Sequence, residues 1–165
     1  MDKVFNVGVI GCGQIAQIMH IPFINDAPFL SLYSICDISR AALSGVAARY
    51  QVPAQRVFTD IHEMVGDPNL DIVLVCCRDH YEPAMAAVKA GKHVYIEKPL
   101  AFNLRQADDI INAAKETGVK TIVGYMKFYD PAYTYFHQKV TGFLDQVTYA
   151  RVHDYAGSFD FTGKI

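Results

Sequence analysis

Short apolar runs with the length of buried strands alternate with segments of helical period along most of this 165-residue chain. The run from Ile72 to Cys76 is apolar at every position, which is typical of a central strand that helices cover on both faces. Such alternation predicts an α/β fold with a doubly wound parallel sheet. Pro22 predicts that the first helix ends near Phe23. We expect strands at 4–10, 30–36, 56–58, 72–76, 93–96 and 121–125, and helices at 15–23, 39–50, 81–90, 103–118 and 131–141.

Capping residues mark several of the expected helix ends. Ser39, Asp60 and Asn103 each precede a helical segment, where a side-chain oxygen can accept from the free N–H groups of the first turn. Gly91 and Gly118 each follow one, where a left-handed residue commonly closes a helix. These residues support the expected helix boundaries.

The charge balance excludes several classes of partner. The chain has 15 basic and 17 acidic residues, a formal charge of −2, and no cluster of either sign, which argues against binding to nucleic acid or to an anionic membrane. Hydrophobic residues make up 52% of the chain, enough for a packed core. No apolar run reaches the roughly 18 residues of a membrane span, and no secretory signal precedes the first strand, so we expect a cytoplasmic protein.

The cysteines give no sign of a metal site or of a disulfide. Cys12, Cys36, Cys76 and Cys77 have no CxxC spacing and no histidine at a metal-ligand interval. An adjacent pair such as Cys76 and Cys77 is a poor disulfide candidate. We expect reduced, mostly buried thiols and no metal site.

A glycine motif directly follows the first predicted strand. Residues 11–16, GCGQIA, match G-x-G-x-x-G/A and open the first helix, and an aspartate ends the second strand about twenty residues further on. The first glycine allows a tight turn, the second lets the backbone approach a pyrophosphate, and the helix N-terminus attracts the phosphates, while the aspartate would accept from ribose hydroxyls. The alternative is a tight turn without a ligand. We predict a Rossmann dinucleotide site formed by Gly11, Cys12, Gly13, Gln14, Ile15 and Asp37.

Two residues after the second strand favour different cofactors. Asp37 would repel the 2′-phosphate of NADP, which favours NAD, whereas Arg40 could pair with that phosphate. Arg40 could equally be a solvated residue in the first turn of the helix that Ser39 caps. We predict NAD, with NADP as the less favoured cofactor, and keep Arg40 as a cofactor-binding candidate.

Two later segments resemble motifs of the Gfo/Idh/MocA oxidoreductases, the family of glucose-fructose oxidoreductase and inositol dehydrogenase. Residues 90–100, AGKHVYIEKPL, are similar to the family's AGKHVxxEKPL segment, and residues 124–133, GYMKFYDPAY, to its GFxRRFDPAY segment. His80 falls where the family carries a histidine after its fourth strand. The resemblance extends from Val4 to about Gly157.

The resemblance implies roles for three further residues. Lys98 corresponds to the lysine that contacts substrate hydroxyls and the nicotinamide ribose, and it is the base that we place near a reacting hydroxyl, so it is our catalytic candidate. Glu97 corresponds to a ribose-side acid, and His80 to an orienting residue near the cofactor. The residues themselves agree, because Glu97, Lys98 and Pro99 end a parallel strand at the edge where such sheets bind ligands. A surface ion pair before a turn is the alternative.

Two departures from the family pattern affect the predicted site. Cys76 and Cys77 stand where the family has Thr-Pro-Asn beside the nicotinamide, and both remain cofactor-binding candidates. Lys127 and Phe128 replace an arginine pair, which exchanges a bidentate fork for a point charge and an apolar ring. Lys127 is therefore a weak substrate candidate.

The family continues into a second α/β domain that covers the active site. By this resemblance residues 1–125 would be the dinucleotide-binding domain, 126–145 a connecting helix, and 146–165 the start of a truncated second domain. Residues 146–155, QVTYARVHDY, alternate like a strand with one exposed face, and we expect this strand to leave an edge open to self-association.

These observations predict the NAD(P)-binding domain of an oxidoreductase that transfers hydride between a nicotinamide and a sugar or polyol. With the second domain absent, we expect little activity. A non-catalytic NAD(P)-sensing regulatory or partner subunit is the alternative, because some family members bind the nucleotide and regulate a partner. A methyltransferase-like Rossmann protein is a third, less favoured, reading.

Overall fold

The computed structural model of the chain describes residues 3–151 and 153. It divides into two compact units, Met1–Gly124 and Tyr125–Ile165. The first contains a β-sheet with helices on both faces, and the second contains helices only among its described residues.

The sheet of the first unit has six strands, and every neighbouring pair is parallel. The spatial order is β3-β2-β1-β4-β5-β6. From β1 the chain adds strands toward one edge of the sheet as far as β3, and then returns to add β4 to β6 on the other side of β1. Such a reversal opens a crevice at the carboxyl ends of the strands, where doubly wound sheets bind ligands. The Rossmann fold is confirmed, with β1 at Phe5–Ile10, β2 at Leu30–Cys36, β3 at Val57–Phe58, β4 at Ile72–Val75, β5 at His93–Ile96 and β6 at Thr121–Val123.

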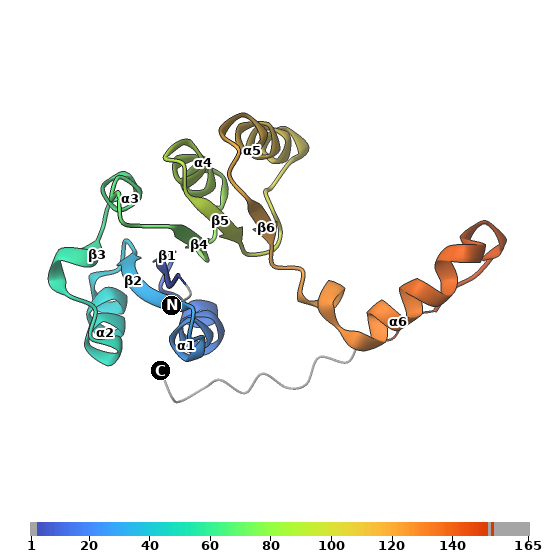
Figure 1. Cartoon of the computed structure of the whole chain (residues 1–165), viewed down its shortest axis with the longest axis horizontal. Helices are drawn as coiled ribbons and strands as arrows, with labels where there is room; N and C mark the ends of the chain where they lie inside the picture. The colour runs from blue at the N-terminus through green and yellow to red at the C-terminus, as the bar shows by residue number, and fades with distance from the viewer. Residues whose placement is uncertain (1–2, 152, 154–165) are drawn as a thin grey trace. The chain divides into compact units, whose positions relative to one another are not determined.

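Two buried clusters lie on the opposite faces of this sheet. One packs β1 and β2 against the first two helices through residues such as Ile21 and Val46, and the other packs β4 and β5 against the later helices through residues such as Val88 and Ile110. Figure 1 shows α1 and α2 on one side of the sheet and α3, α4 and α5 on the other. The helices are η1 at Ala16–His20, α1 at Ile21–Asp26, α2 at Arg40–Tyr50, η2 at Ala54–Arg56, α3 at Ile61–Val65, α4 at Tyr81–Lys89 and α5 at Leu104–Thr117.

The expected caps are present. Ser39 Oγ accepts from Ala42 N at 3.3 Å, and Asn103 Oδ1 accepts from Gln106 N at 3.0 Å. Asp60 accepts from two N–H groups in the first turn of α3. Gly91 and Gly118 have φ of 74° and 72°, the left-handed conformation predicted for the ends of α4 and α5.

The first helix is longer than predicted. It continues through Pro22 to Asp26, because its first part is a π-helix in which Ile21 N donates to Ala16 O. A proline ring clashes with the carbonyl four residues earlier in an ordinary α-helix and lacks an N–H to donate. A wider π turn just before Pro22 accommodates both, so the proline does not end the helix.

The second unit contains η3 at Met126–Tyr129, α6 at Pro131–Val140 and η4 at Thr141–Gln146. None of the residues in these three helices is buried. The strand predicted at 146–155 is wrong for its described part, because residues 147–151 and 153 belong to no strand. A strand requires a partner for its backbone hydrogen bonds, which alternation alone does not supply. Residue 152 and residues 154–165 lie outside the described part, and the expected self-association has no strand in 147–151 to support it.

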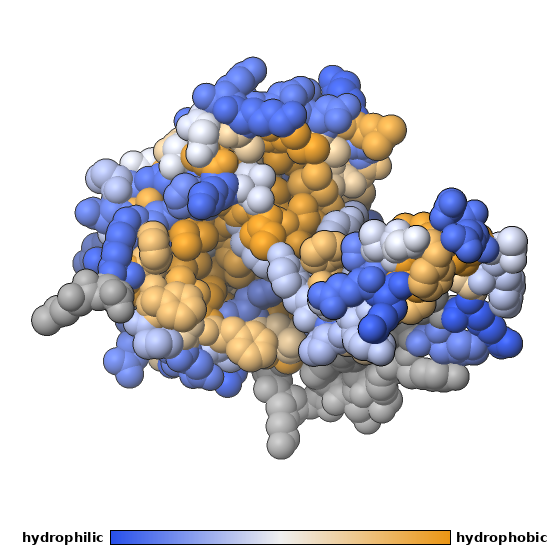
Figure 2. Space-filling model, turned by 45° about the vertical axis from the view of Figure 1, so that its right-hand side comes forward, coloured by the Kyte–Doolittle hydropathy of each residue, from blue (hydrophilic) through white to orange (hydrophobic). Residues whose placement is uncertain are grey.

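The surface combines a polar rim with an apolar area. Figure 2 shows hydrophobic residues gathered over a broad area of one face, below a rim of hydrophilic residues. Within the described ranges, no helix has both the length and the apolar character that crossing a membrane requires.

Candidate functional site

The glycine turn after β1 packs tightly on one side and is open on the other. Gly11 has φ of 91°, its N–H donates to Cys36 O at 2.8 Å, and a Cβ at this position would collide with the backbone of Cys77. Gly13 differs, since a Cβ there would meet no heavy atom within 4 Å. The turn therefore rests on the loop after β4 at Gly11 and leaves room for a ligand at Gly13.

Two backbone N–H groups hold the carboxylate of Asp37. Its Oδ2 accepts from Cys12 N at 2.6 Å, and its Oδ1 accepts from Ser39 N at 2.7 Å. Each carboxylate oxygen can accept a second hydrogen bond, so the group remains able to take ribose hydroxyls. The contacts fix this acid beside the glycine turn.

A cavity of about 440 Å³ opens at the carboxyl edge next to this turn. It brings together five of the predicted cofactor residues. The ends of β1 and β2, the loops after β2, β3 and β4, and the starts of α3 and α4 supply the rest of its wall. Its lining consists of Ile10, Gly11, Gly13, Cys36, Asp37, Ile38, Thr59, Ile61, Cys76, Cys77, Arg78, Asp79, Glu82 and Pro83. Cys12 lies behind the wall, with its side chain fully buried.

All four cysteines are free thiols near this edge. Burial, assisted by the Asp37 carboxylate, raises the pKa of Cys12 and of Cys36 to about 12. Burial raises the pKa of Cys77 to about 11 and raises the pKa of Cys76 further. Neutral thiols are poor nucleophiles, which favours a packing role for them. Across the described residues, no group of three or more His, Cys, Asp and Glu side chains could hold a metal ion.

A second group of predicted residues meets at the ends of β4 and β5. Glu97 follows β5, and its side chain is 12% exposed, whereas the side chain of Lys98 is exposed to solvent. Glu97 Oε1 lies 2.7 Å from Nε2 of His20, a histidine on the first helix. His80, at the start of α4, is buried and donates from Nδ1 to Pro99 O at 2.6 Å.

Four predicted residues are not part of either group. Arg40 lines a neighbouring cavity of about 310 Å³ that contacts the 440 Å³ cavity wall through Thr59. Gln14 and Ile15 are exposed at the helix start and line neither cavity. Lys127 lies in η3 of the second unit, whereas both groups belong to the first.

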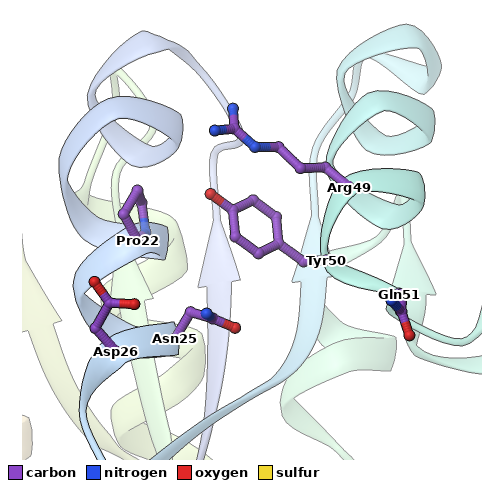
Figure 3. A pocket seen from close by; sticks show the side chains of 6 residues that line it. All are labelled: Pro22, Asn25, Asp26, Arg49, Tyr50 and Gln51. Atoms are coloured by element: carbon purple, nitrogen blue, oxygen red, sulfur yellow. The ribbon is translucent and has the colours of Figure 1, made fainter.

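A third cavity is lined by none of the predicted residues. It measures about 530 Å³ and lies between α1 and α2, near their carboxyl ends. Figure 3 shows the Tyr50 ring pointing from α2 toward Pro22 on α1, with the Arg49 side chain above it, while Asp26 points away. Because helix carboxyl ends carry partial negative charge, this hollow is unfavourable for a pyrophosphate.

His20 is the residue of this site that the sequence interpretation missed. The sequence analysis did not single it out, because one histidine on a helix gives no signal of a contact with a residue 77 positions further along the chain. A possible signal was Pro22, since a proline shortly after a glycine motif can mark a widened turn that redirects neighbouring side chains.

A family model described as an oxidoreductase family with an NAD-binding Rossmann fold, GFO_IDH_MocA, matches residues 5–125. The chain belongs to the Gfo/Idh/MocA oxidoreductase family. Its myo-inositol 2-dehydrogenase relative from Thermotoga maritima is 37% identical over 128 residues, which cover 75% of this chain and 37% of the relative. The chain contains the NAD-binding Rossmann domain of this family and spans less than half the length of that relative.

Solved structures of the Gfo/Idh/MocA family have the same fold. A probable dehydrogenase from Thermotoga maritima has 33% identity and a TM-score of 0.76, over 84% of this chain and 41% of that chain. A 3-ketoreductase variant from Actinomadura kijaniata, in complex with TDP-benzene and NADP, has 26% identity and a TM-score of 0.73, over 87% of this chain and 43% of that chain. Family membership alone therefore does not decide between NAD and NADP.

Proposed function

We propose that this chain binds NAD across the carboxyl edge of its sheet and forms the cofactor half of a sugar or polyol dehydrogenase. The observation that carries the proposal is the Asp37 carboxylate, which Cys12 N and Ser39 N fix beside the open side of Gly13. An acid and an unobstructed turn at the start of a helix suit a ribose and a pyrophosphate, respectively.

The residues of the edge divide between the two ends of a dinucleotide. Gly13 and the following helix would hold the pyrophosphate, and Asp37 the adenosine ribose, on the β1–β2 side. With this orientation, the nicotinamide half would lie on the β4–β5 side, next to Glu97 and Lys98; the change of direction in the strand order between β1 and β4 supports this placement. Bound NAD would supply a hydride acceptor there.

Lys98 is the proposed catalytic residue of this chain. Its side chain is exposed at the end of β5, where a substrate can reach it. Its amine would orient a substrate hydroxyl and take the proton that leaves this hydroxyl during oxidation. The sugar or polyol class follows from relatives such as the inositol dehydrogenase, and other substrate contacts would come from the part of these relatives that this chain does not match.

The preference for NAD over NADP follows from charge. A 2′-phosphate on the adenosine ribose would approach the Asp37 carboxylate, and like charges in contact repel. Arg40 lies at the neighbouring cavity, where it could offset part of that repulsion. We expect the carboxylate to dominate because its position is fixed by two hydrogen bonds.

Titration calorimetry with NADH and NADPH tests the proposal. We expect NADH to bind about tenfold more tightly, which corresponds to roughly 1.4 kcal/mol. Asp37→Ser should remove most of this preference, whereas Asp26→Ser, which changes an acid at the separate cavity of Figure 3, should leave it unchanged. Absence of binding by either nucleotide would refute the function, and equal affinities would refute the NAD assignment alone. An NAD(P)-sensing subunit would show the same binding without turnover.

A further inference from the structure

The segment Glu97–Pro99 is held at both ends by histidines from other elements. We propose that His20 and His80 form a clamp that positions Lys98 against the nicotinamide half of the cofactor. This inference rests on the proposed dinucleotide function and adds a positioning role for His20, which acts through Glu97.

The first point of the clamp is an almost buried pair. The side chains of His20 and Glu97 are 17% and 12% exposed, and His20 Nε2 lies 2.7 Å from Glu97 Oε1. The His20 ring also packs edge-on against Tyr95, with ring centroids 5.3 Å apart. A charge-assisted hydrogen bond shielded from water is among the stronger polar contacts in proteins. His20 therefore fixes the carboxylate of Glu97 firmly.

The same carboxylate holds the backbone of the catalytic candidate. Glu97 Oε2 accepts from Lys98 N at 3.0 Å, so each of its oxygens already has a partner within the protein. Through Glu97 the first helix is connected to the residue that carries the amine. Loss of His20 would leave a mostly buried carboxylate without its strongest partner, and such a group moves toward water.

The second point of the clamp lies on the other side of Lys98. His80 is only 7% exposed, and its Nδ1 is 2.6 Å from Pro99 O. Since a carbonyl oxygen can only accept, Nδ1 carries the proton of this hydrogen bond. His80 thereby connects the start of α4 to the segment after β5, and Lys98 is the residue between the two fixed points.

The π turn explains how His20 reaches Glu97. The hydrogen bond from Ile21 N to Ala16 O spans five residues instead of the usual four, and His20 is the last residue of that turn. An α-helix rotates by about 100° per residue, so an inserted residue redirects every side chain that follows it. Single π turns occur frequently at functional sites, where they aim particular side chains. Here the redirected side chain is the one that contacts the Glu97 carboxylate.

A purely structural role for the pair predicts a different result from a positioning role. ADP-ribose contains the adenosine and pyrophosphate groups of NADH but lacks the nicotinamide. A general loss of structure would weaken the binding of both ligands alike. A displaced Glu97–Pro99 segment would weaken only the binding of NADH, whose nicotinamide reaches that segment. The ratio of the two dissociation constants therefore isolates the clamp.

We would measure NADH and ADP-ribose binding to the 165-residue chain and to its variants, with nicotinamide fluorescence as a second readout. His20→Leu should weaken the binding of NADH about tenfold, because one charge-assisted hydrogen bond is lost on the nicotinamide side. The binding of ADP-ribose should weaken by less than about twofold. His20→Gln, which retains an N–H donor near the place of Nε2, should recover most of the affinity. His93→Leu is the matched control, because His93 lies at the opposite end of β5 and contacts Lys120 N.

The clamp would be overturned if His20→Leu weakened the binding of both ligands equally, or changed the binding of neither. Either result would leave the proposed function intact. Failure of the unsubstituted chain to bind either ligand would overturn both. If His20→Leu does not fold, Glu97→Gln provides the same test. Its amide oxygen can still accept from His20, but its NH₂ group cannot accept from Lys98 N, so NADH alone should bind more weakly. Unchanged NADH affinity in Glu97→Gln would also contradict the clamp.

Discussion

The two halves of the sheet edge are built in different ways. On the β1–β2 side backbone groups build most of the site, with the tight turn at Gly11, the open approach at Gly13 and the Cys12 N–H that holds the Asp37 side chain. On the β4–β5 side it consists of side chains that reach in from distant elements, as His20 does to Glu97. Where backbone groups form the site, most side-chain substitutions should be tolerated, but few substitutions of the glycines. Where side chains form the site, loss of any one partner should disturb its geometry.

The largest expected effect is that of Gly11→Ala on stability. The φ of 91° disfavours any side chain, and a Cβ would collide with the backbone of Cys77. Strain and overpacking together should lower the free energy of unfolding by about 2–4 kcal/mol. Urea denaturation measures this loss. A nearly neutral result would show that the turn does not rest against the loop after β4.

Gly13→Ala should separate binding from stability on the same turn. Its Cβ would meet no protein atom within 4 Å, so the free energy of unfolding should change by less than about 0.5 kcal/mol. The methyl group would occupy the space that a pyrophosphate needs, and we expect about tenfold weaker NADH binding by calorimetry. Unchanged affinity would place the pyrophosphate elsewhere and remove the functional contrast between the two glycines.

The smallest effect concerns Cys77, on the loop that both halves share. Burial raises its pKa to about 11, so its thiolate fraction, and with it the rate of alkylation by iodoacetamide, should rise about tenfold per pH unit from neutral pH upward. NADH should slow this reaction a few-fold, because Cys77 lines the 440 Å³ cavity. Peptide mass spectrometry gives both rates, and the urea-unfolded chain is the reference for an ordinary thiol. Fast labelling of the folded chain at neutral pH would contradict the raised pKa of Cys77. No protection by NADH would contradict binding of the cofactor in the 440 Å³ cavity.

Local signals predicted most of the fold. Apolar runs located the six strands, and Ser39, Asn103 and Gly118 marked helix ends, because each of these features depends on neighbouring residues alone. The two errors arose where a longer-range effect decides. Pro22 suggested a helix end, but a wider preceding turn absorbs the proline, and the alternation in 146–155 resembled a strand although 147–151 forms none.

The candidate site was predictable where it follows from a spacing within a short segment of the sequence. The glycines and Asp37 follow from a spacing within one βαβ unit, and the structure brings them together around one cavity. The partner of Glu97 could not be read in this way, since His20 precedes it by 77 residues and reaches it through a π turn. Arg40 is the opposite case. Its place in the sequence suggested a cofactor contact, but in the structure it lines the neighbouring cavity.

The close approach of Gly11 to Cys77 has a consequence for how the edge responds to a ligand. With no room for even a methyl group between them, the turn after β1 and the loop after β4 cannot shift independently. An adenosine that anchors at Asp37 then meets a neighbouring surface whose shape is already set, so little ordering remains to oppose binding of the rest of the molecule. The edge should behave as one preformed platform, on which the two ends of a dinucleotide reinforce each other through their covalent connection.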